Sequence, residues 1–197
     1  MCRSMDDSTS LSLLELACER NESAWGKIVE VYEPLIRLWC QRWGLSEFET
    51  DDICQHVFHM AFLKLTEFER RQSGSFRSWI FAISRNKLKD TILEQKKLKP
   101  LKNLERFENQ PSDTEENELL YRRCISLIES NFSSRDVEII REYILKDRAA
   151  RDVAEEFQIS ENAVYVIKHR VVNKVLEEFR GVLDLKQSLF ISAQAER

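Results

Sequence analysis

Basic and aromatic side chains suited to binding phosphates and bases are concentrated in the stretch from Ser73 to Asp90. Its first residues, Ser73–Ser75, can turn the chain and cap a helix. The apolar side chains of this helix recur at the spacing of one buried face, and they are Phe76, Trp79, Ile80 and Ile83. The polar side chains project from the other face, and they are Arg77, Arg85, Asn86, Lys87 and Lys89. Cationic groups beside a large aromatic ring bind phosphates and exposed bases, so this helix is a candidate nucleic-acid site, although an ordinary solvated face has a similar composition.

A second candidate site lies near the C-terminal end, in a predicted helix-turn-helix. A short helix at residues 147–157 is followed by a turn at 158–160 and by a longer helix that Ser160 can cap. In such a motif the second helix lies in the DNA major groove, and its first turns reach base edges or phosphates. The candidate contacts are Glu161, Asn162, Ala163, Tyr165, Lys168, His169 and Arg170. A helical hairpin packed inside a protein core would show the same pattern.

Helices are expected to carry both sites, because the chain of 197 residues contains only 4 Gly and 3 Pro and few alternating apolar runs. We predict an all-α fold of two small helical domains joined by a linker. The expected parts are a bundle at 1–98 with its core at 25–95, a linker at 99–113, a helix-turn-helix domain at 114–181 and a tail at 182–197.

Three amphipathic helices are expected to form the N-terminal bundle. The first follows a cap at Asn21, should be kinked by Pro34 and ends at Gly44. The second begins at a capping box made by Ser46 and Glu49, and the third is the basic helix described above.

Composition gives a weak indication of the partner. The formal net charge is −4, but residues 85–106 hold eight Lys and Arg against three Asp and Glu, and local clustering decides the field that a ligand meets. The five cysteines are odd in number and irregularly spaced, and no segment is apolar enough to span a bilayer. We therefore expect reduced thiols, a cytoplasmic location and no membrane insertion.

Three stretches of the chain resemble signatures of one family. Residues 50–58 are similar to the first signature of conserved region two of bacterial RNA polymerase sigma factors, and residues 73–86 are similar to the next signature in that region. Residues 153–170 resemble conserved region four. Their order and the linker between them are typical of the compact extracytoplasmic-function group of the sigma-70 family. The chain departs from the family pattern at His56, at Gln158 and at residues 165–167.

The resemblance implies a sigma factor, without enzymatic activity or cofactor, that binds core RNA polymerase and promoter DNA. The implied polymerase-binding residues are Asp51, Asp52, Gln55, His56 and His59. The loop at 67–75 and the helix after it would hold the opened strand of the −10 element through Phe76, Arg77, Trp79, Arg85, Asn86 and Lys89. The C-terminal candidate contacts given above would read the −35 element as duplex. The resemblance also implies a monomer when free and regulation by an anti-sigma factor as a possible further partner.

An enzyme is one alternative class. The four scattered glycines exclude a phosphate-cradling loop, and Cys54, His56 and His59 are poorly placed for zinc because Cys54 points away from the shared face of the two histidines. A dimeric helix-turn-helix regulator with an N-terminal sensing or dimerisation bundle remains the alternative, and it would bind a palindromic site.

Overall fold

The computed structural model describes residues 13–68, 75–96 and 113–183, and these residues form helices without a strand. The α-helices are α1 (Leu13–Cys18), α2 (Glu22–Arg42), α3 (Glu47–Lys64), α4 (Phe76–Lys96), α5 (Asp113–Ile128), α6 (Ser134–Ile140), α7 (Ala150–Glu156) and α8 (Glu161–Glu178). Short 3-10 helices at Leu65–Glu67 and Glu129–Asn131 and a π-helical turn at Arg141–Leu145 extend α3, α5 and α6. The all-α prediction is confirmed for the described residues.

The N-terminal helices begin where local sequence signals place them. The Asn21 side chain accepts a hydrogen bond of 2.9 Å from the backbone N–H of Ala24 and caps α2. Ser46 and Glu49 form the expected capping box at the start of α3. Gly44 has a φ of 76°, a conformation that glycine adopts without a steric penalty, and α2 ends just before it. Pro34 lies inside α2, which continues on both sides of it.

The helix-turn-helix is formed by α7, the turn after it and α8. The Ser160 side chain accepts a hydrogen bond of 3.2 Å from the N–H of Ala163 and caps α8. Gln158 has a φ of 53°, so it occupies the left-handed turn position at which glycine would be less strained. Asp147 also has a positive φ, of 52°, and α7 therefore begins at Ala150, later than the sequence pattern indicates.

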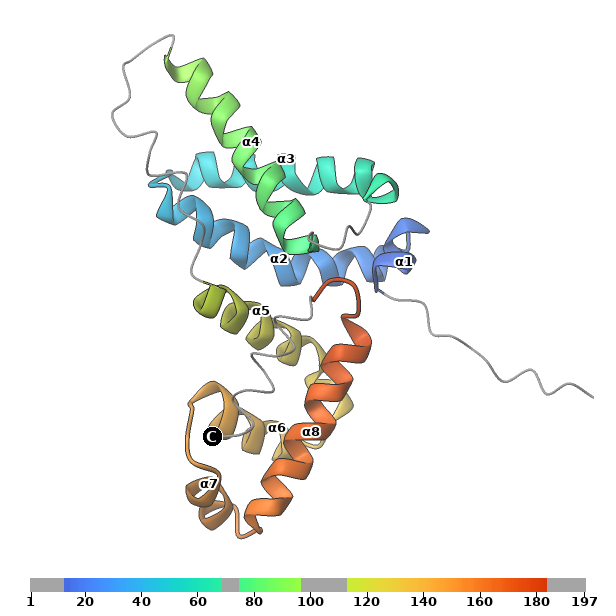
Figure 1. Ribbon diagram of the computed structural model, residues 1–197, viewed down its shortest axis with the longest axis vertical. Coiled ribbons are helices and arrows are strands. Elements are labelled where there is room, and N and C mark those ends of the chain that lie inside the picture. The colour runs from blue at the N-terminus through green and yellow to red at the C-terminus, as the bar shows by residue number, and fades with distance from the viewer. Residues whose placement is uncertain (1–12, 69–74, 97–112, 184–197) are drawn as a thin grey trace, which may run out of the picture.

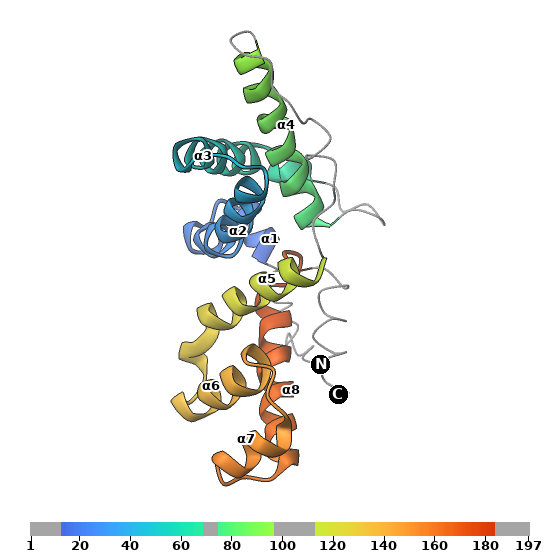
Figure 2. The same ribbon diagram turned by 90° about the vertical axis from the view of Figure 1, so that its left-hand side faces the viewer.

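Figures 1 and 2 show α2, α3 and α4 stacked at one end of the molecule and α5 to α8 at the other, with α5 lying along α2. One hydrophobic core runs from α1 through α5 to the end of α8. Tyr32, which is buried in it, donates a hydrogen bond of 2.8 Å to the carbonyl oxygen of Val182. Val182 and Leu183, the first residues of the expected tail, are therefore buried in this core. A smaller core lies under the helix-turn-helix and contains Ile139, Tyr143, Ala150, Val153, Ala154 and Val164.

Among the described residues, no helix has both the length and the apolar character needed to cross a membrane.

Candidate nucleic-acid interface

The aromatic residues at the start of α4 belong mainly to the core. The Ser75 hydroxyl accepts a hydrogen bond of 3.2 Å from the N–H of Ser78 and so caps α4, which begins at Phe76. Phe76 is 2% exposed, and its ring packs edge-on against Tyr32 with the centroids 5.1 Å apart. The sequence assigns Phe76 both to the buried stripe and to the DNA contacts. The structure corrects the second assignment, because burial in the core leaves no ring face for a base.

Trp79 lies at the edge of the same cluster. Its ring is 4.8 Å from that of Phe68 and 5.5 Å from that of Phe76, and the side chain is half-buried. Trp79 thus keeps part of its surface accessible beside the basic face of α4.

The basic residues of α4 lie in two different environments. Asn86 and Lys89 are exposed, and the ammonium group of Lys87 lies 3.1 Å from the Asp52 carboxylate of α3. The half-buried Arg85 has its Nε atom shielded from solvent, and this atom has no hydrogen-bond partner in the part of the chain that the structure describes. A buried donor of this kind is costly, and a phosphate can contact only the part of this half-buried side chain that remains exposed.

Arg77, by contrast, is engaged by α5. Its guanidinium donates bonds of 3.3 Å to the carboxylate of Glu116 and of 3.3 Å to the side-chain oxygen of Asn117. Glu116 is 1% exposed and also accepts hydrogen bonds from Trp39 at 2.7 Å and from Arg42 at 3.2 Å. A carboxylate this deeply buried needs such donors to offset its loss of hydration. The Glu116 network, defined as Glu116 with these donors, therefore fixes α5 against α2 and α4.

One face of α3 presents the residues that the resemblance assigns to polymerase binding. Gln55 and His59 are exposed, and Asp51 and Asp52 form ion pairs at the helix surface with Arg37 at 2.8 Å and with Lys87 at 3.1 Å. Burial, followed by the nearby Lys87 charge, lowers the pKa of His56 below its ordinary value, so its imidazole is neutral at pH 7.

Sequence reasoning missed the apolar residues on this face. Phe48 is 84% exposed and Leu63 is 54% exposed, and Phe62 is also exposed. At helical spacing Phe48, Gln55, His59 and Leu63 lie on one side of α3, so two apolar side chains flank a polar centre. A periodicity search looks for the apolar residues that line a core, so Phe48 and Leu63 were passed over, and their exposure in the fold reveals this surface.

Cys54 lies in the core and is turned away from the two histidines. It is 5% exposed, and burial raises its pKa to about 11. No cluster of three potential metal ligands occurs among the described residues.

The exposed face of α8 carries most of the predicted C-terminal contacts. Glu161, Asn162, Tyr165, His169 and Arg170 are exposed, and Ala163 is half-buried. The Tyr165 ring packs edge-on against Tyr143 at 6.0 Å. Val166, which sequence reasoning did not select, is 59% exposed in the middle of this face.

Lys168 differs from the other predicted contacts because it is buried. It is 5% exposed, and its ammonium group lies 5.3 Å from the centre of the Tyr143 ring. Within the described part of the chain its Nζ atom has no hydrogen-bond partner, and burial lowers its pKa. The structure thus corrects the assignment of Lys168 to the DNA-reading face, since its side chain packs on an aromatic ring of the domain core.

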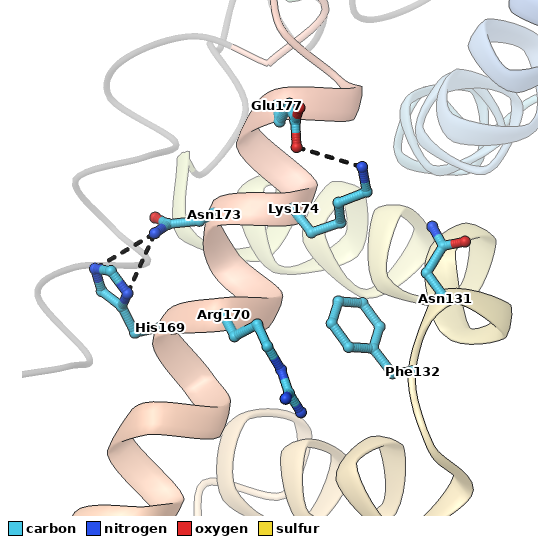
Figure 3. A pocket seen from close by; sticks show the side chains of 7 residues that line it. All are labelled: Asn131, Phe132, His169, Arg170, Asn173, Lys174 and Glu177. Carbon is cyan, nitrogen blue, oxygen red and sulfur yellow. Dashed lines mark hydrogen bonds and ion pairs between the residues drawn. The ribbon is translucent and has the colours of Figure 1, made fainter.

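A surface pocket of about 430 Å³ lies where α8 passes the connection between α5 and α6 (Figure 3). Arg170 reaches the Asp136 carboxylate at 2.6 Å, and Lys174 reaches Glu177 at 3.3 Å. On the other side of α8, the Asn173 amide lies 3.2 Å from the His169 ring. The residues of α8 that line the pocket, from His169 to Glu177, continue the polar face of this helix for about two turns toward its C-terminal end.

Residues 28–98, which include most of α2 and all of α3 and α4, match the model of sigma-70 region 2. These residues are a sigma-70 region 2. The candidate strand-binding residues of α4 and the exposed face of α3 both belong to this sigma-70 region 2. Residues 116–194 match the model of a putative helix-turn-helix protein described as YlxM/p13-like.

Two curated relatives are RNA polymerase sigma factors. The chain is 29% identical over 85 residues to the sigma factor NccH of Alcaligenes xylosoxydans xylosoxydans, a stretch that covers 43% of this chain and 45% of the relative. It is 30% identical over 74 residues to the sigma factor CnrH of Cupriavidus metallidurans, which covers 38% of each chain. The match therefore spans less than half the length of these relatives. The prediction of a sigma-70 region 2 is confirmed for residues 28–98, and the prediction of a C-terminal helix-turn-helix domain is confirmed by the match at residues 116–194.

Proposed function

We propose that this chain is a sigma factor that binds core RNA polymerase and directs it to promoters carrying −10 and −35 elements. The observation that carries the proposal is a sigma-70 region 2 followed in the same chain by a helix-turn-helix domain. In this role the chain acts in the cytoplasm and binds DNA and protein without catalysing a reaction.

The exposed face of α3 is the proposed polymerase-binding surface, comprising Phe48, Asp51, Asp52, Gln55, His56, His59, Phe62 and Leu63. Exposed aromatic and aliphatic side chains supply most of the affinity of a protein interface when a partner buries them. The carboxylates between them set the orientation of a basic partner surface. Because Asp51 and Asp52 are held by Arg37 and Lys87, their positions are fixed before the partner arrives.

The α4 helix of region 2 is the proposed binding surface for the opened −10 strand, called the −10 grip below. Arg85 carries a half-buried guanidinium whose exposed part can bind a phosphate, and Asn86 and Lys89 lie exposed beside it. The accessible part of Trp79 extends this surface toward the start of the helix. The loop at 67–75 lies largely outside the described residues.

Arg77 can bind the opened strand only after its hydrogen bonds to Glu116 and Asn117 are broken and replaced by bonds to DNA. The same bonds fix α5 against region 2, and duplex reading by α8 at a distant element requires the two halves to separate. We therefore propose that the parts at 1–98 and 114–181 act as two domains on the linker at 99–113. Mounting both on polymerase raises the effective concentration of each for its DNA element.

The arrangement in which Arg77 is bonded to α5, called the closed arrangement, also accounts for the expected behaviour of the chain without polymerase. It should be a monomer that binds promoter duplex weakly, because Arg77 is occupied and the formal net charge is −4. An anti-sigma protein could hold the chain inactive by covering the faces of α3 and α4.

Size-exclusion chromatography with light scattering tests this proposal against a dimeric regulator. The chain alone should elute as a monomer, and with purified bacterial core polymerase it should elute as a one-to-one complex. A stable dimer that binds a palindromic duplex and ignores core polymerase would contradict the proposal.

A further inference from the structure

An exposed valine occupies the centre of the polar face of α8. Val166 is 59% exposed, whereas the core-facing valines of this helix, including Val164 and Val175, are fully buried. Valine forms helices less readily than alanine, so helix stability gives no reason for Val166 at a surface position. Core packing gives none either, because most of the side chain faces solvent.

The residues around Val166 suit base recognition in a major groove. Asn162, Val166, His169 and Asn173 follow one another at spacings of four, three and four residues, and all of them are exposed. This row starts in the first turn after the Ser160 cap and reaches the pocket of Figure 3. The row consists of hydrogen-bonding side chains, apart from the two methyl groups of Val166.

The major-groove edge of DNA offers a single type of apolar group, the C5-methyl group of thymine. A β-branched side chain in a helix is almost confined to one rotamer, so the methyl groups of Val166 are held in place before DNA binds. Tyr165, the neighbouring exposed apolar residue, is held instead against the Tyr143 ring. Val166 is therefore the side chain of this face best placed to meet a methyl group.

We propose that Val166 is a specificity-determining residue, which packs against the C5-methyl group of one thymine in the −35 duplex. This inference rests on the proposed function and adds to it the base that the middle of α8 selects. Burying about one methyl group corresponds to roughly fourfold in affinity. The expected contribution is thus a preference for thymine over other bases at one position.

A double-mutant cycle between protein and DNA tests the contact. A promoter is first selected from a pool with a randomised −35 duplex, using core polymerase loaded with the full chain. Each thymine of the selected −35 element is then replaced singly by deoxyuridine, which removes only the methyl group. Competition binding is measured for the complex with the wild-type chain and with Val166→Ala.

One thymine of the −35 element should differ from the others in how its replacement by deoxyuridine affects binding. Its replacement by deoxyuridine should weaken binding about fourfold with the wild-type chain and by less than about 1.5-fold with Val166→Ala, the lost contact being worth about one methyl group. Val166→Ile, which keeps the branch at Cβ and one γ-methyl group, should retain the dependence on thymine. Glu177→Ala, about three turns further along α8, is the matched control and should leave the fourfold effect intact.

Other outcomes overturn the inference. A selected −35 element without thymine, or deoxyuridine effects that are equal for the wild-type chain and Val166→Ala, would show that Val166 does not read a methyl group. In both cases the loaded polymerase still binds the promoter, so the proposed function stands. Failure of the chain to load polymerase or to select any promoter would overturn both.

Discussion

Arg77 of α4 and Glu116 of α5 lie 3.3 Å apart across the contact between the two halves of the chain. Arg77 is a candidate DNA-binding residue, and Glu116 is almost fully buried. The contact therefore couples the closed arrangement of the helices to the state of the proposed −10 grip. The proposed separation of the two halves would expose the Glu116 carboxylate and release the Arg77 guanidinium at the same time.

Glu116→Gln should lower the free energy of unfolding by about 1–3 kcal/mol, because a buried charge that offsets two guanidinium groups is lost while the shape is kept. Urea denaturation followed by circular dichroism measures the change. Glu118→Gln is the matched control, since Glu118 pairs with Arg122 at the exposed surface of the same helix, and its effect should stay within about 0.5 kcal/mol. Equal losses for the two variants would show that the Glu116 network does not hold the halves together.

Lys168→Met should raise the free energy of unfolding at pH 7 by about 1 kcal/mol, because it removes an ammonium group that is buried without a hydrogen-bond partner. Burial lowers the pKa of Lys168 in the folded chain, so the unfolded chain binds its proton more tightly. Wild-type stability should therefore rise relative to the variant as pH increases from the folded pKa toward the ordinary value of 10.5. Urea denaturation at pH 7 and pH 10 tests this.

Lys168→Met should also leave promoter binding by the loaded polymerase unchanged, since the side chain lies in the domain core. A loss of affinity as large as that of Arg170→Ala would return Lys168 to the DNA-binding surface.

The proposed polymerase surface can be tested at its apolar ends. Phe48→Ser and Leu63→Ser should each weaken the binding of core polymerase about tenfold or more, because a partner that buries these side chains loses an anchor. Both residues are exposed, so the free energy of unfolding should barely change. Gln41→Ala, at an exposed position of α2, is the control for fluorescence-based titration. Unchanged affinity in both serine variants would place the polymerase contact elsewhere.

Local signals in the sequence predicted much of this fold. The caps at Asn21, Ser46 and Ser160 depend on residues only three positions apart, and the turn at 158–160 follows from the helix-turn-helix spacing. Such features need no knowledge of the rest of the chain.

Features that depend on distant residues were not predictable in this way. Lys168 is buried because Tyr143, in the π-helical turn at Arg141–Leu145, offers its ring. Glu116 is buried because Trp39 and the two arginines supply donors from far along the chain. Phe48 and Val166 were not singled out, because a periodicity search looks for the apolar residues that line a core and passes over those that fall outside the stripe.

Arg85→Ala should reduce strand opening about tenfold while leaving polymerase binding intact, because the Arg85 guanidinium is the proposed phosphate contact of the opened strand. Permanganate reactivity of unpaired thymines in the −10 element measures the opening. Arg122→Ala removes an exposed guanidinium from α5 and should have no effect. If Arg85→Ala opens promoters as well as the wild-type chain, Arg85 is not part of the grip.

The most direct measurement of the central claim is run-off transcription with purified bacterial core polymerase and a pool of promoter templates, with and without the chain. We predict transcripts with defined start sites only when the chain is present, and a strong reduction of these transcripts when Phe48 and Leu63 are both replaced by serine. Transcription that is identical with and without the chain on every template would contradict the assignment of this protein as a sigma factor.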